Sequence, residues 1–279
     1  MQGVILVNKQ INKTSRDMVN ELNHIFDMKK IGHTGTLDPM ATGVLVMCLG
    51  KYTKLVEELS QMTKEYIATI KVGLKTDTLD ITGKVLEERK CSFSYEDVEN
   101  VFAGLIGTLE QEIPIYSAKK INGKKLYEYA RNGEEVILPK NEIEIFDIEI
   151  INVEEDQITF KALVSKGTYI RSLIDVICQR LNIIGTMSSL VRTKQGKFDI
   201  KESFTIEQIK EGTYRLLKTK DLFSFPVYEL NDEEYQKAKN GNKLNINLDN
   251  KKIILEYANN EIAIYEKEED LYKPYVMLI

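Results

Sequence analysis

The sequence of 279 residues predicts an α+β protein whose central sheet is mixed or mostly antiparallel. Apolar and polar side chains alternate at 66–72 and 158–164, which is the pattern of half-buried strands. In other segments apolar side chains recur at helical spacing, which is typical of amphipathic helices. The two patterns do not follow each other in the regular order of βαβ units, so a doubly wound parallel sheet is not expected.

The N-terminal part of the chain predicts a strand, a helix and a buried strand. The first strand is expected at 4–7, and the helix begins at Ser15, with apolar side chains at positions 18, 19, 22, 25 and 26 on one face. The wholly apolar run at 44–49 predicts the buried strand. Between the helix and this strand lies GHTGTLDPMATG at 32–43, where glycines, threonines and an Asp-Pro pair predict a tight turn.

Two further helices are expected before the C-terminal part. A capping box at Ser94–Asp97 predicts a helix that ends at Gly107. Apolar residues at positions 170, 173, 174, 177 and 181 predict another amphipathic helix.

The chain changes character near residue 229, and we expect a body at 1–228 and a small β-rich domain at 229–279. A short helix opens at Asn231–Glu234 and ends at Asn240-Gly241. Strands are expected at 244–248, 252–257 and 261–265, with turn chemistry at Asn259-Asn260.

Composition excludes several classes of protein. No apolar run approaches the roughly 18 residues of a membrane span, and the first residues lack the regions of a signal peptide. We therefore expect a cytoplasmic protein with no membrane partner. Three cysteines form no CxxC pair and only two histidines occur, so neither a disulfide framework nor a metal site is expected.

The charge is unevenly distributed along the chain, whose net charge is −5. The basic segment, residues 113–131, holds five basic residues against Glu128 alone. By contrast, 134–156 holds nine acids against Lys140, and 229–279 holds eleven acids against seven lysines. A basic segment in an acidic protein fits a nucleic-acid partner, but a solvated charged face remains the alternative on charge alone.

The turn at 32–43 admits three interpretations: a phosphate cradle, a catalytic loop or a structural turn. No lysine lies between Gly32 and Gly50 and the GxGxxG spacing is absent, so nucleotide binding is not expected. Asp38 is either a turn residue before proline or a catalytic carboxylate. The glycines would let a substrate approach the backbone, and the strand would anchor the loop. A lone carboxylate needs an orienting cation, which the turn itself does not identify.

Seven segments together resemble one family of enzymes. GHTGTLDPMATGVL (32–45) resembles the catalytic motif of the TruB-type tRNA pseudouridine synthases, which isomerise uridine 55 in the T-loop of tRNA. The other motifs follow in the family's order. They are NKQINKTS (8–15), KEY (64–66), GLKTDTLDITG (73–83), PIYSAKKINGKKLYEYAR (114–131), SKGTYIRSL (165–173) and LVRTKQGKF (190–198).

This resemblance implies an architecture and a set of partners. The fold would be a pseudouridine synthase fold, its mostly antiparallel sheet flanked by helices and loops, with a tRNA-binding, thumb-like insertion at about 112–142. The tail from 229 resembles a PUA-like module through KNGNKL (239–244). That tail either binds RNA or only packs on the body. The enzyme would act alone as a monomer on the T-arm of tRNA, with no protein partner and no metal or organic cofactor.

The resemblance also implies the reaction centre. Asp38 would be the catalytic aspartate, and Arg171 would form an ion pair that orients it. From the sequence alone, Arg171 could equally be an exposed helix residue paired with Asp175. Tyr66 would stack on the flipped uracil and is the candidate for taking the C5 proton, although its alternating strand also fits a core role.

Further residues would bind the substrate. His33 would take the place of the extruded base in the T-loop, because a stacked uridine must leave its stack before it can react. Lys9 matches the family's structural lysine, and Tyr169 and Leu190 match residues that line the uracil pocket. The basic segment would contact the RNA backbone. Its basic residues are Lys119, Lys120, Lys124, Lys125 and Arg131.

The sequence departs from the family's motifs at three positions. Gln10 and Asn12 stand where the first motif has proline and glycine, and Tyr52 stands where a later motif has alanine. Asn tolerates a left-handed turn, so the first motif can keep its shape. Two alternatives remain for function: a synthase that depends on a guide RNA, and a non-catalytic RNA-binding or tRNA-folding protein.

Overall fold

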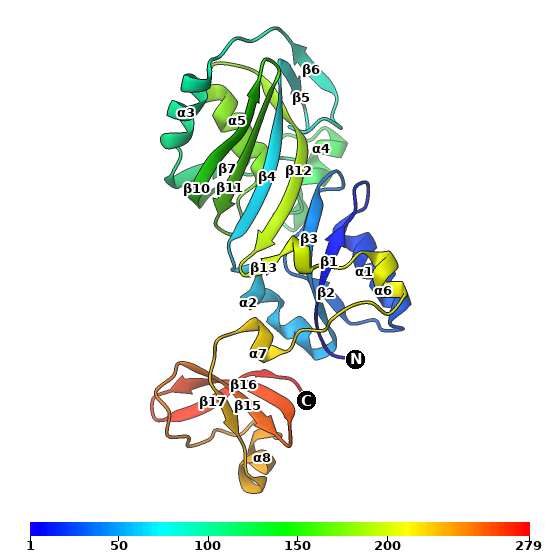
Figure 1. Cartoon of the computed structure of the whole chain (residues 1–279), viewed down its shortest axis with the longest axis vertical. Coiled ribbons are helices and arrows are strands. Elements are labelled where there is room, and N and C mark those ends of the chain that lie inside the picture. Colours follow the sequence, from blue (N-terminus) through cyan, green and yellow to red (C-terminus); the bar gives the residue numbers. More distant parts are fainter.

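The computed structural model describes all residues from 1 to 279 and contains two main sheets. The large central sheet lies at one end of an elongated molecule and a smaller C-terminal sheet lies at the other (Figure 1). The central sheet has the strand order β1-β3-β12-β4-β11-β10-β7, with β2 paired to β3 and β13 to β12. Every pairing in it is antiparallel except that of β3 with β12, which confirms the predicted α+β class with a mixed, mostly antiparallel sheet.

Four of the nine strands of the central sheet fall at or near the expected positions: β1 (Gly3–Lys9), β3 (Thr42–Leu49), β4 (Lys64–Val72) and β11 (Gln157–Val164). The other five were not predicted: β2 (Ile31–His33), β7 (Gly107–Glu112), β10 (Lys140–Glu154), β12 (Gly185–Gln195) and β13 (Phe198–Asp199). Two short hairpins lie outside it. They are β5 (Leu74–Thr76) with β6 (Val85–Glu88), and β8 (Lys120–Ile121) with β9 (Lys124–Lys125).

Capping residues start two of the helices, and the cap at Ser94 was predicted from the sequence. The side chain of Thr14 caps α1 (Ser15–Ile25), and that of Ser94 caps α3 (Tyr95–Ala103), each with a reciprocal aspartate. The predicted end of α3 is wrong, because Gly104 already caps the helix and Gly107 instead opens β7 with a φ of +110°. The remaining helical segments are η1 (Gly50–Leu55), α2 (Val56–Ser60), α4 (Leu126–Asn132), α5 (Ile170–Arg180), η2 (Ile200–Glu202), α6 (Ile206–Lys210) and α7 (Thr219–Leu222). No helix is both long and apolar enough to cross a membrane.

Helices α3 and α5 cover one face of the central sheet (Figure 1), and the largest core lies between them. Phe102 of α3 meets Phe160 of β11 edge to face, with ring centroids 5.5 Å apart. Because both rings are buried, replacing Phe160 by alanine should cost about 3–5 kcal/mol of stability. The same core contains Leu173, Ile174 and Ile177 of α5 and so fixes this helix, whose first turn carries Arg171.

The C-terminal sheet contains two of the three expected strands and two strands that were not expected. It consists of β14 (Val227–Glu229), β15 (Lys252–Tyr257), β16 (Asn260–Glu268) and β17 (Leu271–Met277), with α8 (Asp232–Ala238) beside them. The prediction of a strand at 244–248 is wrong, since only Leu244 forms a bridge, to Tyr272. Leu244 and Ile246 are buried, so the alternating apolar residues at 244–248 reflect burial of their side chains and not a strand that pairs along its length.

The two sheets share a continuous buried cluster. Val44 and Leu55 from the central part pack with Ile254 and Ile264 of the C-terminal sheet. Tyr52, which is 1 % exposed, donates its hydroxyl hydrogen bond to Glu261 across this boundary. The same carboxylate accepts the main-chain N–H of Thr219 at 2.8 Å, so this contact ties three segments together.

Candidate active site

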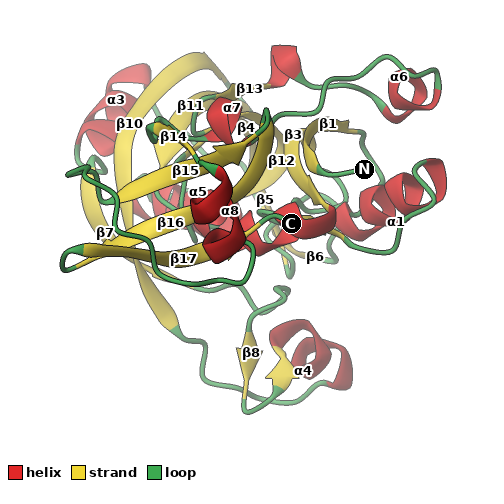
Figure 2. Cartoon of the chain, turned by 90° about the horizontal axis from the view of Figure 1, so that it is seen from below, coloured by secondary structure: helices red, strands yellow, loops and turns green.

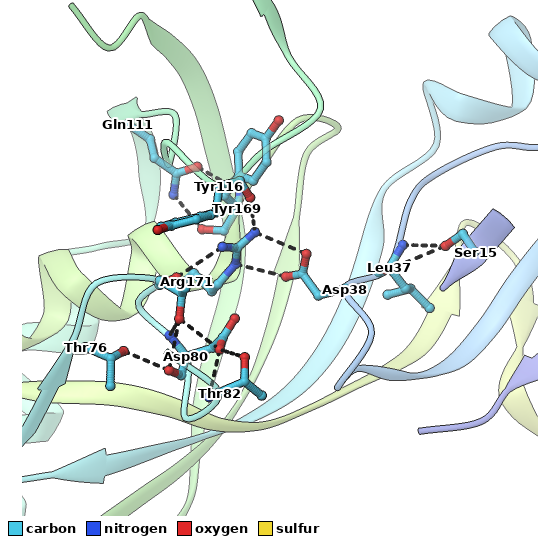
Figure 3. A network of polar contacts seen from close by, with 11 residues as sticks. Ser15, Leu37, Asp38, Thr76, Asp80, Thr82, Gln111, Tyr116, Tyr169 and Arg171 are labelled. Carbon is cyan, nitrogen blue, oxygen red and sulfur yellow. Dashed lines mark hydrogen bonds and ion pairs between the residues drawn. The ribbon is translucent and has the colours of Figure 1, made fainter. Parts of the chain in front are cut away.

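Asp38 lies in the Asp38 loop, residues 34–41, which joins β2 to β3. The loop is held from the side of α1. The Oγ of Ser15 accepts the N–H of Leu37 at 2.9 Å (Figure 3), and the ammonium group of Lys9 donates to the carbonyl of Pro39 at 3.2 Å. Asp38 is therefore flanked on both sides by fixed main-chain positions.

Arg171 forms a bidentate ion pair with the carboxylate of Asp38 (Figure 3). Its Nε lies 2.9 Å from Oδ2 and its Nη2 lies 3.1 Å from Oδ1. The guanidinium also donates to the carbonyls of Thr78 and Tyr116, so its plane is fixed. The alternative partner Asp175 accepts instead from Gln179. Such a bidentate pair is a strong and directional contact.

The electrostatics of this pair come from burial and from two charges. Arg171 has a side chain 5 % exposed and that of Asp38 is 30 % exposed. Burial raises the pKa of Asp38, the charge of Arg171 opposes that rise, and nearby Asp80 adds to it. The carboxylate is thus partly desolvated while its ionised form is stabilised by Arg171.

Tyr66 and Leu190 come from neighbouring strands of the central sheet. Tyr66 lies on β4, opposite Arg192 of β12, and Leu190 lies two residues before Arg192. Tyr66 and Leu190 are 7 % and 6 % exposed and belong to the same buried cluster as Leu37, the residue before Asp38. The structure therefore places both near the Asp38 loop.

Two more of the expected residues lie close to this loop. His33 ends β2, and its Nδ1 is buried without a hydrogen-bond partner. Burial, followed by the charges of Arg192 and Arg16, lowers the pKa of His33 and keeps its imidazole neutral at physiological pH. Tyr169 precedes α5, where burial raises the pKa of its phenol.

Lys9 has no exposed surface and bonds only main-chain carbonyls: those of Gln10, Lys13 and Pro39. Burial is the main cause that lowers its pKa to about 8, although the charge of Asp38 opposes the change. Asn12 in the same turn has a φ of +62°, so it adopts the left-handed conformation that a glycine would allow. These contacts make Lys9 a support of the Asp38 loop.

Comparison with known proteins identifies the family of this chain. Residues 23–170 match the family model described as "TruB family pseudouridylate synthase (N terminal domain)". The chain belongs to the TruB family of pseudouridylate synthases. It is 42 % identical to "tRNA pseudouridine synthase B" of Caldanaerobacter subterraneus subsp. tengcongensis, over 86 % of this chain and 85 % of that protein. It is 36 % identical to the protein of the same name from Lactobacillus acidophilus, over 100 % of this chain and 99 % of that protein.

A solved structure gives the same answer for the fold. The chain resembles a protein in the structure of an H/ACA RNP bound to a substrate RNA containing 2'-deoxyuridine, with a TM-score of 0.72. The likeness covers 99 % of this chain and 85 % of that one, at 19 % sequence identity. It confirms the predicted pseudouridine synthase fold for this member of the TruB family.

The basic segment of this TruB-family chain leaves the central sheet between β7 and β10, and β8 and α4 project from the main body (Figure 2). Lys119, Lys120 and Arg131 are exposed. Lys124 instead pairs with Glu134 at 2.6 Å, and Lys125 donates to the hydroxyl of Tyr127 at 3.0 Å. The expected basic residues therefore fall into a free group and a group already engaged within the segment.

Two buried polar residues near the site were not singled out from the sequence. Asp80, 6 % exposed, accepts from Thr82 and Thr78 and so shapes the turn whose carbonyl binds Arg171 (Figure 3). Gln111, with no exposed surface, exchanges two hydrogen bonds with the main chain of Tyr169, at 2.8 and 3.0 Å. Asp80 lies in the family motif at 73–83, from which it could have been identified, whereas no sequence pattern around Gln111 indicates a role for it.

Proposed function

We propose that this protein is a tRNA pseudouridine synthase that isomerises uridine 55 in the T-loop of tRNA. Membership of the TruB family and the names of the most similar relatives support this activity. The observation that carries the proposal is the bidentate contact between Asp38 and Arg171, because it gives the family's motif an oriented, partly desolvated carboxylate. The reaction cleaves the C1′–N1 bond, rotates the uracil and joins it to the ribose through C5.

In this proposal Asp38 is the catalytic residue. It acts in its ionised form, either by attack on C1′ or by starting a glycal route. Arg171 holds both carboxylate oxygens, which fixes the direction of the free lone pairs and offsets the effect of burial on the pKa of Asp38. The chain's own carboxylate supplies the chemistry, with no metal or organic cofactor.

The pocket for the extruded uracil would be formed by Tyr66, Tyr169 and Leu190. The aromatic face of Tyr66 offers a stacking surface for the base, and its hydroxyl is the candidate for taking the C5 proton. Neutral tyrosine is a weak base because its ordinary pKa is about 10. His33, held neutral, would stack in the place that the base leaves in the T-loop.

Binding of the T-arm would rest on the basic segment, with Lys9 supporting the catalytic loop from inside. Exposed Lys119 and Lys120 have their charges free for phosphates, and exposed Arg131 lies over the ring of Tyr127. We assign catalysis to 1–228, with the thumb-like insertion at about 112–142, and a PUA-like unit to 229–279. We further propose that the enzyme acts as a cytoplasmic monomer without a protein partner.

The experiment is to incubate the purified protein alone with an unmodified tRNA transcript and to map pseudouridine. The expected result is product at uridine 55. Binding of the transcript without product would contradict the proposal and favour a non-catalytic RNA-binding protein. Product that appears only when a guide RNA is added would favour the guide-dependent alternative. That alternative is tested because the chain resembles in fold a protein of an H/ACA RNP.

Replacement of Asp38 by asparagine tests the reaction centre. Asp38→Asn should abolish turnover, while the affinity for tRNA stays within about tenfold because phosphate contacts dominate binding. Wild-type turnover in this variant would mean that the reaction centre is elsewhere.

A further inference from the structure

Arg192 is a buried guanidinium without a carboxylate partner. It lies on β12, is 1 % exposed and forms no ion pair. Its Nε donates to the carbonyl of Val44 at 2.7 Å, and its Nη2 donates to the carbonyl of Gly35 at 3.1 Å. Burying a charge without an ion pair is costly, so a side chain kept in this state calls for a specific explanation.

Arg192 is anchored on β3 and contacts the Asp38 loop at Gly35. A Cβ added to Gly35 would lie 3.3 Å from Nη1, so the loop backbone packs directly on the guanidinium. A Cβ added to Gly43 would lie 2.2 Å from the carbonyl oxygen of Arg192, where β3 pairs with β12. The main chain of Arg192 therefore packs on β3, and its side chain contacts the loop.

Within the Asp38 loop, the hydrogen bond from Arg192 falls on the half next to His33, at Gly35. Residues Ser15 and Lys9 hold the other half, at Leu37 and Pro39. For the main chain of 33–36, the bond from Arg192 to Gly35 is the one hydrogen bond that comes from a side chain. The charge of the same guanidinium, after burial, contributes to the lowered pKa of His33.

We propose that Arg192 is a positioning residue that sets the place of His33 for extrusion of the target base, separately from the Asp38–Arg171 pair. The proposal rests on the proposed function, in which His33 fills the space left by that base. In this view Arg192 fixes the residues that follow His33, which would open the RNA stack, whereas Ser15 and Lys9 fix the residues on either side of Asp38, which would react.

The test is a double-mutant cycle between Arg192→Lys and His33→Ala, read as single-turnover rates on a tRNA transcript. Lysine cannot donate to Val44 and Gly35 from one fork, so Arg192→Lys should slow the reaction about tenfold with tRNA affinity unchanged. If Arg192 acts through His33, the double variant should be within about threefold of His33→Ala alone. The matched control is Ser15→Ala, which removes the hydrogen bond to Leu37 beside Asp38. The rate of the double variant Ser15→Ala/His33→Ala should be reduced by the product of the two single reductions.

Several results would overturn the inference. One is a double variant whose rate is reduced by the product of the two single reductions, which would mean that Arg192 and His33 act independently. Another is a wild-type single-turnover rate for either Arg192→Lys or His33→Ala alone. If Arg192→Lys does not fold, Gly35→Ala replaces it in the cycle, because the added methyl crowds Nη1 while the loop keeps an ordinary φ. Failure of the wild-type protein to form any product would instead contradict the proposed function itself.

Discussion

The guanidinium of Arg171 holds both carboxylate oxygens of Asp38, across 133 residues of chain, at 2.9 and 3.1 Å. Because burial raises the pKa of Asp38 and Arg171 opposes that rise, the pair sets the pH at which the carboxylate is ionised. The contact thus both orients the carboxylate of Asp38 and stabilises its ionised form.

Arg171→Lys should shift the pH dependence of catalysis as well as its rate. A lysine donates from one point, so the fork on Asp38 is lost and the pKa of Asp38 moves further up. The active, ionised form is then lost at a higher pH, and activity relative to wild type should be lower at about pH 6 than at about pH 8. Single-turnover rates across this range check the prediction. Parallel profiles for the two proteins would show that Arg171 does not control the ionisation of Asp38.

The buried Lys64 should make the stability of the protein rise with pH in alkaline solution. Burial, with the charges of Arg192 and Lys166, lowers the pKa of Lys64 from 10.5 to about 8. Between these two values the unfolded chain binds more protons than the folded one, so the penalty of the buried charge disappears as the pH rises. Lys64→Met should remove about 2 kcal/mol of the gain in unfolding free energy between about pH 8 and pH 10.

Urea unfolding of both proteins at the two pH values measures this difference. The comparison uses only the change with pH, because Lys64→Met also removes the hydrogen bonds to the carbonyls of Ser60 and Met62. An equal pH dependence in both proteins would contradict a depressed pKa for Lys64.

Local signals in the sequence predicted much of the fold. Alternation identified β4 and β11, helical spacing placed the start of α1, and the capping box placed the start of α3 within a residue, because these features depend on neighbours in the chain. The expected strand at 244–248 failed because alternation reports which side chains are buried and not which backbone groups pair.

The site was less accessible to sequence reasoning because its contacts span distant segments. Spacing alone could not choose between Asp38 and Asp175 as the partner of Arg171, and only the family resemblance pointed to Asp38. Gln111 meets Tyr169 from 58 residues away, with no local pattern to mark it. Tyr52 departs from the family's motif yet lies at the boundary with the C-terminal sheet, where its role depends on Glu261.

Tyr52→Phe should loosen the contact between the two sheets. The change removes a buried hydroxyl that donates to Glu261 and leaves that carboxylate short of one donor, at a cost of about 1–3 kcal/mol. Tyr275→Phe is the matched control, because that hydroxyl also binds a carboxylate, Glu58, but its residue is 41 % exposed. The control should change the unfolding free energy by less than about 0.5 kcal/mol. Equal effects in chemical unfolding would contradict the assignment of Tyr52 as the buried link.

The free lysines of the basic segment should contribute more to the salt dependence of tRNA binding than the engaged one. Lys119 is exposed and forms no ion pair, whereas Lys124 already pairs with Glu134. Each phosphate contact releases condensed counterions, so log affinity falls as log salt concentration rises. If Lys119 contacts a phosphate, Lys119→Ala should reduce the magnitude of this slope by roughly one. Lys124→Ala should lower it by less, because Glu134 already offsets that charge. Binding titrations at about 50 to 200 mM salt measure both slopes. A slope that is unchanged in Lys119→Ala but reduced in Lys124→Ala would mean that Lys124 exchanges Glu134 for the RNA backbone on binding.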